Sequence, residues 1–159
     1  MKIFNMVESE NKLPTVVIAS DHGGYVMKES LVKYLGARYT IIDCGTDSTD
    51  SCDYPDFAEK CCLKVLEGKE NYIGILICGT GIGMSISANK IKGIRCALCT
   101  DTTSAKLSRQ HNNANVVAIG ERVIGEEVAK DVVDTFLSTS AFTIERHVNR
   151  VNKITRLES

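Results

Sequence analysis

Five short apolar runs constrain the fold of this chain more than any other feature of its sequence. Most of them are apolar on successive residues rather than on alternate ones. That pattern is typical of strands covered on both faces, as in a parallel sheet. The runs are TVVIAS (15–20), YTIIDCG (39–45), IGILICG (73–79), IRCALC (94–99) and NVVAIG (115–120). We therefore predict a sheet of about five parallel strands.

Between these runs lie segments with the period of an amphipathic helix, because their apolar residues recur every three or four positions. The residues are Met27, Leu31, Tyr34 and Leu35; Phe57, Cys61, Val65 and Leu66; and Val128, Val132, Phe136 and Leu137. Strands that alternate with helices predict right-handed crossovers. The expected fold is an α/β three-layer sandwich (α/β/α) with a five-stranded, Rossmann-like parallel sheet and a C-terminal helix. We expect a polar extension at residues 1–14 and a single domain over residues 15–159.

Composition disfavours several classes of partner and location. The formal net charge is −1 at pH 7, which gives no electrostatic reason to expect nucleic acid or a membrane surface as a partner. No apolar run approaches the roughly 20 residues of a membrane-spanning helix. Residues 1–14 lack the apolar core of a signal peptide. We therefore expect a cytoplasmic protein with all seven cysteines reduced.

The segments that follow the predicted strands contain most of the residues that could bind a ligand or take part in catalysis. In a parallel sheet, ligands bind at the carboxyl ends of the strands. These segments are SDHGG (20–24), CGTDSTDSCDYPD (44–56), CGTGIG (78–83), CTDTTSAKLSRQHNN (99–113) and GERVIG (120–125). His22, which follows Asp21, and His111, which precedes Asn112, are therefore expected at neighbouring strand ends, where they become candidates for one site.

Gly79, Gly81 and Gly83 expose the backbone of the third of these segments. Glycines let a ligand approach N–H groups without meeting a Cβ atom, and the helix predicted after them adds the positive end of its dipole. The spacing G-x-G-x-G differs from the dinucleotide fingerprint, and the lysine and hydroxyl of a P-loop are missing. Two readings remain open: a site for an oxyanion formed during a reaction, and a tight turn without a ligand.

Cys78 stands directly before this loop. A helix N-terminus increases the thiolate fraction of a nearby thiol, so Cys78 is a candidate reactive group, with a packing cysteine as the alternative. A zinc site is disfavoured. Cys96 and Cys99 form a C-x-x-C pair, but Cys96 lies inside a predicted strand, and no second pair completes a tetrahedral set.

The last helical segment has an apolar and a basic stripe. The apolar residues are Ile144, Val148, Val151 and Ile154, and the basic ones are Arg146, Arg150 and Lys153. A basic stripe is more often a solvated face, but two arginines one turn apart can also grip one phosphate. We expect the arginine face to turn toward the strand ends and the apolar stripe to pack on a neighbouring surface. His147 is expected to have no functional role.

These segments together resemble the sugar-phosphate isomerases of the ribose-5-phosphate isomerase B type, whose relatives include galactose-6-phosphate isomerase subunits. The matching stretches cover nearly all of residues 15–154: IASDHGGYVMKESL, DCGT, YPDFAEK, GILICGTGIGMSISANKIKGIRCAL, SRQHNNANVVAIGERVIG and ERHVNRVNKI. CGTGIGMSISANK together with SDHGG is a specific signature. One departure is Gly24, where many relatives have alanine, and we expect it to have little effect.

The resemblance implies an aldose–ketose isomerase that interconverts D-ribose 5-phosphate and D-ribulose 5-phosphate through an enediolate, in the non-oxidative branch of the pentose phosphate pathway. It implies three catalytic roles: Cys78 as general base between C2 and C1, His111 as the acid that opens the sugar ring, and Thr80 as a proton relay. The substrate-binding residues that it implies are Asp21, His22, Tyr54, Gly79, Gly81, Ile82, Gly83, Asn112, Arg122, Arg146 and Arg150.

The resemblance further implies no metal and no organic cofactor. It implies a homodimer or a dimer of dimers, with sites shared between subunits, and no nucleic-acid or membrane partner. Two alternatives stay open. A non-catalytic sugar-phosphate-binding subunit would need neither Cys78 nor His111. An isomerase of six-carbon sugar phosphates would differ in pocket length, which depends on loop positions that the sequence does not give.

Overall fold

The sheet has five parallel strands, as predicted. The computed structural model of the protein describes residues 12–158, so the extension expected at residues 1–14 lies mostly outside the described residues. The strands are β1 (Thr15–Ser20), β2 (Ile41–Asp43), β3 (Tyr72–Cys78), β4 (Cys96–Leu98) and β5 (Val116–Gly120). Their order is β2-β1-β3-β5-β4, and every pairing is parallel.

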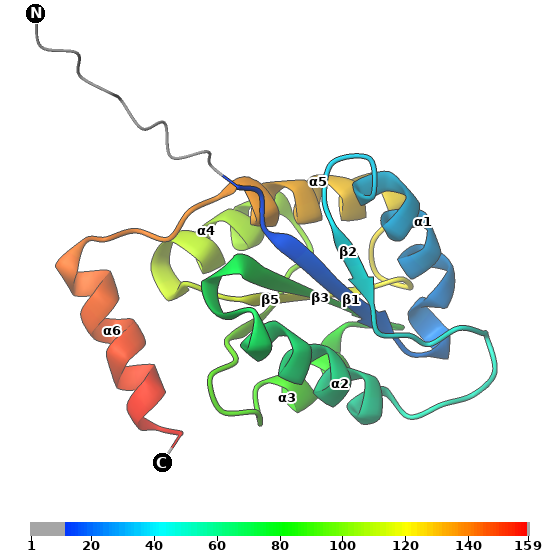
Figure 1. The fold of residues 1–159 in the computed structure, drawn as a ribbon, viewed down its shortest axis with the longest axis horizontal. Helices are drawn as coiled ribbons and strands as arrows, with labels where there is room; N and C mark the ends of the chain where they lie inside the picture. Colours follow the sequence, from blue (N-terminus) through cyan, green and yellow to red (C-terminus); the bar gives the residue numbers. More distant parts are fainter. Residues whose placement is uncertain (1–11, 159) are drawn as a thin grey trace, which may run out of the picture.

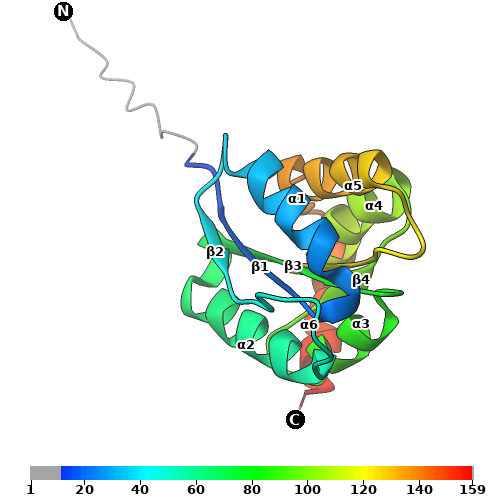
Figure 2. The same ribbon diagram turned by 90° about the vertical axis from the view of Figure 1, so that its right-hand side faces the viewer.

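Helices cover both faces of this sheet, which confirms the predicted α/β/α sandwich (Figures 1 and 2). The helices are α1 (Tyr25–Leu35), α2 (Tyr54–Glu67), α3 (Ile82–Ala88), α4 (Thr102–Asn112), α5 (Glu126–Ser138) and α6 (Glu145–Arg156), with short 3-10 turns η1 (His22–Gly24) and η2 (Lys69–Asn71). Helices α1, α4 and α5 lie on one face, and α2 and α3 on the other. None of the helices in the described part of the chain is long and apolar enough to cross a membrane.

Two apolar cores, one on each face, account for the consecutive apolar residues of the strands. In β1, Ile18 points into the core beneath α1 and α5, and its neighbour Val17 points into the core above α2 and α3. Both side chains are fully buried. Because successive strand residues face opposite ways, a strand covered on both faces needs apolar residues throughout.

The neighbouring strands β1 and β3 create the crevice in which a ligand can bind. They pair from Thr15 and Tyr72 to Ser20 and Ile77. The chain leaves β1 toward α1 on one face and leaves β3 toward α3 on the opposite face. Such a switch point opens a crevice beyond the carboxyl ends of the two strands, and this is where open α/β sheets bind ligands.

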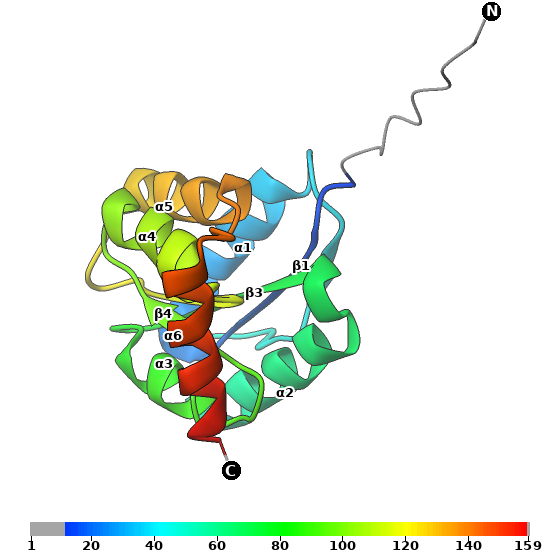
Figure 3. The ribbon, with the colours of Figure 1, turned by 90° about the vertical axis from the view of Figure 1, so that its left-hand side faces the viewer.

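The final helix, α6, stands apart from the layers and packs mainly beside α4 (Figure 3). Several of its apolar side chains remain uncovered, with Ile144, Val148 and Ile154 each about two-fifths exposed (44%, 41% and 38%). The predicted apolar stripe therefore finds only part of its packing surface within this chain.

Candidate active site

Cys78 ends β3 at the switch point, and its sulfur receives a hydrogen bond from the glycine loop. The N–H of Gly81 donates to Cys78 Sγ over 3.1 Å, and the thiol is buried. Gly81 has a φ of 78°, and a Cβ atom there would lie 2.7 Å from Leu98 Cδ1 and 2.9 Å from the carbonyl carbon of Ile119. Only glycine suits both the conformation and the space.

The packing cysteines contrast with Cys78. The thiol of Cys61 donates to the carbonyl of Val17, and burial raises its pKa well above the ordinary value. Burial also raises the pKa of Cys62 to about 12. All seven cysteines are free thiols in the structure. Cys61 and Cys62 are therefore uncharged packing groups near neutral pH.

Asp21 and His22 lie against the glycine loop. Asp21 Oδ1 accepts from the N–H of Gly23 over 2.9 Å, and a Cβ on Gly23 would lie 3.2 Å from the backbone nitrogen of Gly79. His22 is half-buried, and its Nδ1 accepts from the N–H of Cys52 over 3.2 Å. The structure thus brings Asp21 and His22 together with the loop after Cys78, as the sequence predicted.

Gly24 lets the η1 turn lie directly on β3. A Cβ atom at Gly24 would lie 2.7 Å from both the carbonyl carbon and the carbonyl oxygen of Ile77. Alanine at this position would therefore require the backbone to shift, and the small effect expected of Gly24 stays a prediction. The close contact fixes the turn that carries His22.

Tyr54 and Arg122 form the rim of the same loop. The ring of Tyr54, the first residue of α2, lies 2.8 Å from where a Cβ on Gly83 would stand, and Arg122 Nη1 lies 3.3 Å from the corresponding position on Gly79. Both side chains are exposed. Thr80 is exposed too, and its Oγ1 accepts from the N–H of Ile82 over 3.2 Å. A phosphate could therefore reach the Arg122 guanidinium from solvent.

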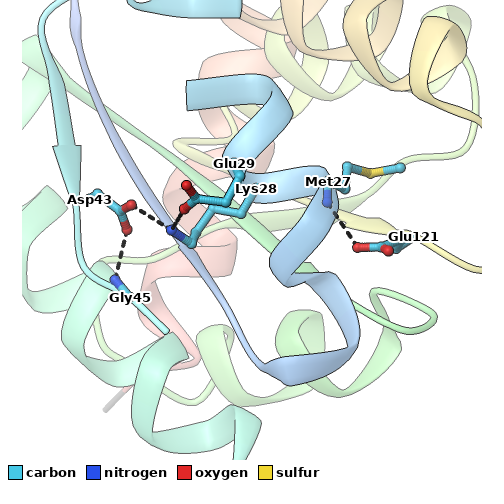
Figure 4. Close-up of polar contacts among 6 residues, drawn as sticks. All are labelled: Met27, Lys28, Glu29, Asp43, Gly45 and Glu121. Carbon is cyan, nitrogen blue, oxygen red and sulfur yellow. Dashed lines mark hydrogen bonds and ion pairs between the residues drawn. The ribbon is translucent and has the colours of Figure 1, made fainter. Parts of the chain in front are cut away.

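Glu121 holds the segment that carries Arg122. Its Oε2 accepts from the N–H of Met27 over 3.0 Å, in the first turn of α1 (Figure 4). That helix has no side-chain cap of its own, because Gly24 occupies the N-cap position. A carboxylate near a helix N-terminus is also favoured by the helix dipole. The neighbouring N–H of Arg122 donates to the carbonyl of Gly79 over 2.9 Å, so the segment is tied to two elements.

A buried lysine anchors the loop that supplies Cys52. Lys28 is 1% exposed, and its Nζ lies 2.5 Å from Asp43 and 2.8 Å from Glu29. Asp43 also accepts from the N–H of Gly45 over 2.8 Å (Figure 4). Burial acts to lower the pKa of Lys28, but the hydrogen bonds and charges of Asp43 and Glu29 outweigh it and raise the pKa. The lysine therefore stays charged.

Sequence reasoning missed this lysine, although a signal existed. Lys28 stands three and seven residues before Leu31 and Leu35, on the buried face of α1. A lysine at that spacing indicates a buried cation that needs a partner, because an unpaired buried charge is very costly. Asp43, at the end of β2, is that partner.

His111 and Asn112 lie at the opposite edge of the sheet from Cys78, so the expectation of neighbouring strand ends is wrong within one chain. Helix α4 starts after β4 and ends at Asn112, four residues before β5 begins. Its 11 residues carry the chain back by about 16 Å. Arg95, just before β4, donates to the carbonyl of Asn112 over 3.1 Å, which places the end of α4 at the amino edge.

Arg146 and Arg150 share this distant location. Both are exposed on α6, which lies beside α4 on the side of the sheet where the strands begin (Figures 1 and 3). The sequence analysis predicts that the arginine face turns toward the strand ends. In the structure this face does not turn toward the glycine loop of the same chain, so that prediction is wrong within one chain. The sequence-predicted residues thus form two groups: one around Cys78 and Arg122, and another at the ends of α4 and α6.

The region around the glycine loop also presents apolar side chains to solvent. Ile82 is 51% exposed, Ile86 is 58% exposed, and Leu98 is 40% exposed. A cavity of about 660 Å³ lies elsewhere, between α6 and the β4 edge, where Asn112, Ile154 and Leu157 line it. Exposed aliphatic clusters of this kind are typical of surfaces covered by a partner.

Comparisons with known proteins agree with this geometry. The family model described as Ribose/Galactose Isomerase matches residues 16–154. The Bacillus subtilis (strain 168) protein YwlF, whose name assigns it provisionally to the sugar phosphate isomerases, is 50% identical over 145 residues, covering 90% of this chain and 96% of that protein. Ribose-5-phosphate isomerase B of Escherichia coli (strain K12) is 45% identical over 144 residues, covering 90% and 95%.

A solved structure extends the similarity to three dimensions. The ribose-5-phosphate isomerase B of Clostridium thermocellum has a TM-score of 0.87 and 48% sequence identity, and the match covers 91% of this chain and 97% of that chain. The similarity therefore extends over most of the chain and includes its overall fold.

Proposed function

Because the chain belongs to the ribose/galactose isomerase family, we propose that it interconverts D-ribose 5-phosphate and D-ribulose 5-phosphate through an enediolate. The observation that carries the proposal is the hydrogen bond from the N–H of Gly81 to Cys78 Sγ at the switch point. An aldose–ketose isomerase needs a base that moves one proton between neighbouring carbons. A thiolate held beside backbone donors is suited to that task.

In this proposal, Cys78 takes the proton from C2 of the open-chain aldose and returns it to C1. The loop Gly79–Gly83 faces the oxygen on which negative charge develops. The N–H groups of Gly79 and Gly83 are its donors, because those of Gly81 and Ile82 already donate to Cys78 Sγ and Thr80 Oγ1. A preorganised donor at such an oxygen typically contributes about 3 kcal/mol. Thr80, whose hydroxyl is exposed beside the loop, moves a proton between the two substrate oxygens.

The first group of residues also binds the rest of the substrate. Arg122 and His22 contact the phosphate, because a guanidinium and an imidazole N–H are good donors to its oxygens. Asp21 holds a sugar hydroxyl, and Tyr54 closes the rim above Gly83. The short distances from the loop to Arg122 and Tyr54 support these assignments.

A second copy of the chain supplies the remaining residues. Its His111 protonates the ring oxygen and opens the furanose, its Asn112 holds a hydroxyl, and its Arg146 and Arg150 complete the phosphate site. Two observations support sharing. Within one chain, α4 carries His111 to the wrong edge, and the uncovered aliphatic side chains beside the loop offer a surface for association.

The alternatives lead to different results in one assay. Purified protein is incubated with ribose 5-phosphate, and ribulose 5-phosphate is measured, alongside allose 6-phosphate and galactose 6-phosphate as six-carbon rivals. We expect the pentose phosphate to be converted with the highest kcat/KM. Binding without turnover of any of the three sugars would instead identify a non-catalytic binding protein.

Two cysteine variants test the assigned base. Cys78→Ala should reduce kcat by roughly 10²–10⁴-fold or more, the usual contribution of a general base, with little change in Tm. Cys62→Ala is the matched control, since it removes a buried thiol away from the loop and should keep kcat. Turnover near the wild-type level in Cys78→Ala would contradict the role of Cys78.

A further inference from the structure

Three rings from three segments form one cluster at the ends of α4 and α6. The imidazole of His147 on α6 lies flat on that of His111 on α4, with ring centroids 4.4 Å apart and planes 3° from parallel. The ring of Phe142, before α6, lies 5.8 Å from each of them, tilted by 46°. His147 is 6% exposed, whereas His111 is only half-buried. The buried ring thus forms a base for the more exposed one.

The two ring nitrogens of His147 are buried without hydrogen bonds to the described residues. Neither Nδ1 nor Nε2 has a hydrogen-bond partner within residues 12–158. A buried imidazole without partners gives up hydrogen bonds that water would provide. What this side chain supplies to the structure is therefore its flat face, which is occupied by His111.

The surroundings of His147 favour the neutral form of its ring. Burial lowers its pKa, and the charges of His111 on α4 and of Arg146 and Arg150 on α6 act in the same direction. A cavity of about 140 Å³ beside the two imidazoles is lined by the neutral side chains of Gln110, Asn113 and Asn152, among others.

The stack also joins two parts of the proposed machinery. Arg146 is the neighbour of His147 on α6, and Arg150 follows it by three residues, so the phosphate-binding arginines flank the stacked ring in sequence. Near its other end, α6 is held by Glu158, whose carboxylate accepts from the N–H of Gly93 over 3.0 Å. The contact between His147 and His111 therefore fixes the arginines relative to the imidazole on α4.

We propose that His147 is a positioning residue for His111: its buried ring holds the plane of the His111 imidazole and sets the spacing between that imidazole and the arginines of α6. The inference rests on the proposed function, in which His111 opens the sugar ring. His111, which opens the sugar ring, and Arg146 and Arg150, which bind the phosphate, then act on the site of the neighbouring subunit as one rigid unit.

Two substitutions separate the face of the ring from its nitrogens. His147→Phe keeps a flat, buried ring and removes the nitrogens, and His147→Ala removes the face. Asn149→Ala, at an exposed position of the same helix, is the control. Conversion of ribose 5-phosphate, which must be opened, and of ribulose 5-phosphate, which need not be, is measured for each variant.

We expect His147→Ala to lower kcat for ribose 5-phosphate about tenfold or more, the usual scale of acid–base assistance being 10²–10⁴-fold. The loss for ribulose 5-phosphate should be smaller, and His147→Phe should restore most of the activity. Equal losses in His147→Phe and His147→Ala would overturn the proposal, because the nitrogens would then matter rather than the face.

Nuclear magnetic resonance gives a readout that is independent of turnover. The ring protons of His111 should carry a ring-current shift in the wild type that His147→Ala reduces and His147→Phe retains. Unchanged His111 resonances in His147→Ala would overturn the stack itself. Absence of wild-type turnover, with the ring-current shift present, would instead overturn the proposed function and with it the catalytic part of this inference.

Discussion

The backbone N–H of Cys52 donates to Nδ1 of His22 over 3.2 Å, and this single contact determines which nitrogen of His22 can bind a phosphate. Since Nδ1 accepts, a neutral His22 carries its proton on Nε2. The Nε2–H is then the group available to the substrate. The loop that supplies Cys52 is anchored in turn by the Lys28–Asp43 pair.

The tautomer of His22 can be tested with two amide substitutions. The side-chain amide of His22→Gln places a donor near the position of Nε2, whereas His22→Asn places it near Nδ1. We expect the KM for ribose 5-phosphate to be roughly 2- to 10-fold lower in His22→Gln than in His22→Asn. This difference corresponds to one hydrogen bond of about 0.5–1.5 kcal/mol. Nitrogen-15 spectra of the wild-type ring should show the Nε2–H form. A lower KM in His22→Asn would contradict the assignment.

The Lys28–Asp43 pair should stabilise the fold and keep the Cys52 loop in place. Asp43→Asn leaves the buried ammonium with only Glu29, so we expect a loss of about 1–3 kcal/mol in the free energy of unfolding, measured with urea. Glu29→Gln is the control and should cost less, because the Glu29 side chain is 53% exposed. If the two variants were equally stable, the pair would not be the anchor of this loop.

Much of the fold could be predicted from local sequence. The run at residues 15–20 coincides with β1, because a strand buried on both faces leaves no alternative to continuous apolar residues. Pro55 lies in the first turn of α2, where a missing N–H costs nothing. The glycine loop could also be recognised from local sequence, because Gly81 takes a conformation that other residues rarely adopt.

The placement of His111 could not be predicted in this way. A segment that follows a strand in sequence lies at the carboxyl edge only at its start, and the 11 residues of α4 carry His111 to the other edge. The strand order was likewise open, because local pattern does not determine which strands become neighbours. His147 gave no signal, since its contact with His111 joins two helices distant in sequence.

Acidic pH should destabilise the protein through His147. Burial lowers the pKa of this imidazole below its ordinary value of 6.5, assisted by His111, Arg146 and Arg150. Over the interval between the two pKa values, the unfolded chain binds a proton that the folded chain does not, so the free energy of unfolding falls as the pH drops below 6.5. His147→Phe should therefore lose less of its Tm than the wild type between about pH 7 and pH 5. Equal losses of Tm would show that His147 titrates normally.

A mixture of two inactive variants tests whether the site is shared between copies. Cys78→Ala lacks the proposed base, and His111→Ala lacks the proposed ring opener, so neither homodimer should convert ribose 5-phosphate efficiently. In a mixed dimer, one site combines Cys78 of the second variant with His111 of the first and is intact, whereas the other site lacks both. Random association makes about half of the dimers mixed, with one intact site of two, so about a quarter of wild-type activity should return.

The mixture must be prepared by co-expression, or by unfolding and refolding the two chains together, so that subunits exchange. Mixing Cys78→Ala with Cys78→Ala/His111→Ala is the matched control and should restore nothing, because no site in that mixture contains the base. If each site took both residues from one chain, as a simple monomeric enzyme would, the first mixture would also stay inactive. That outcome would contradict the shared site, and α4 of a single chain would then have to bring His111 to the edge that carries Cys78, against the course of the helix in this structure.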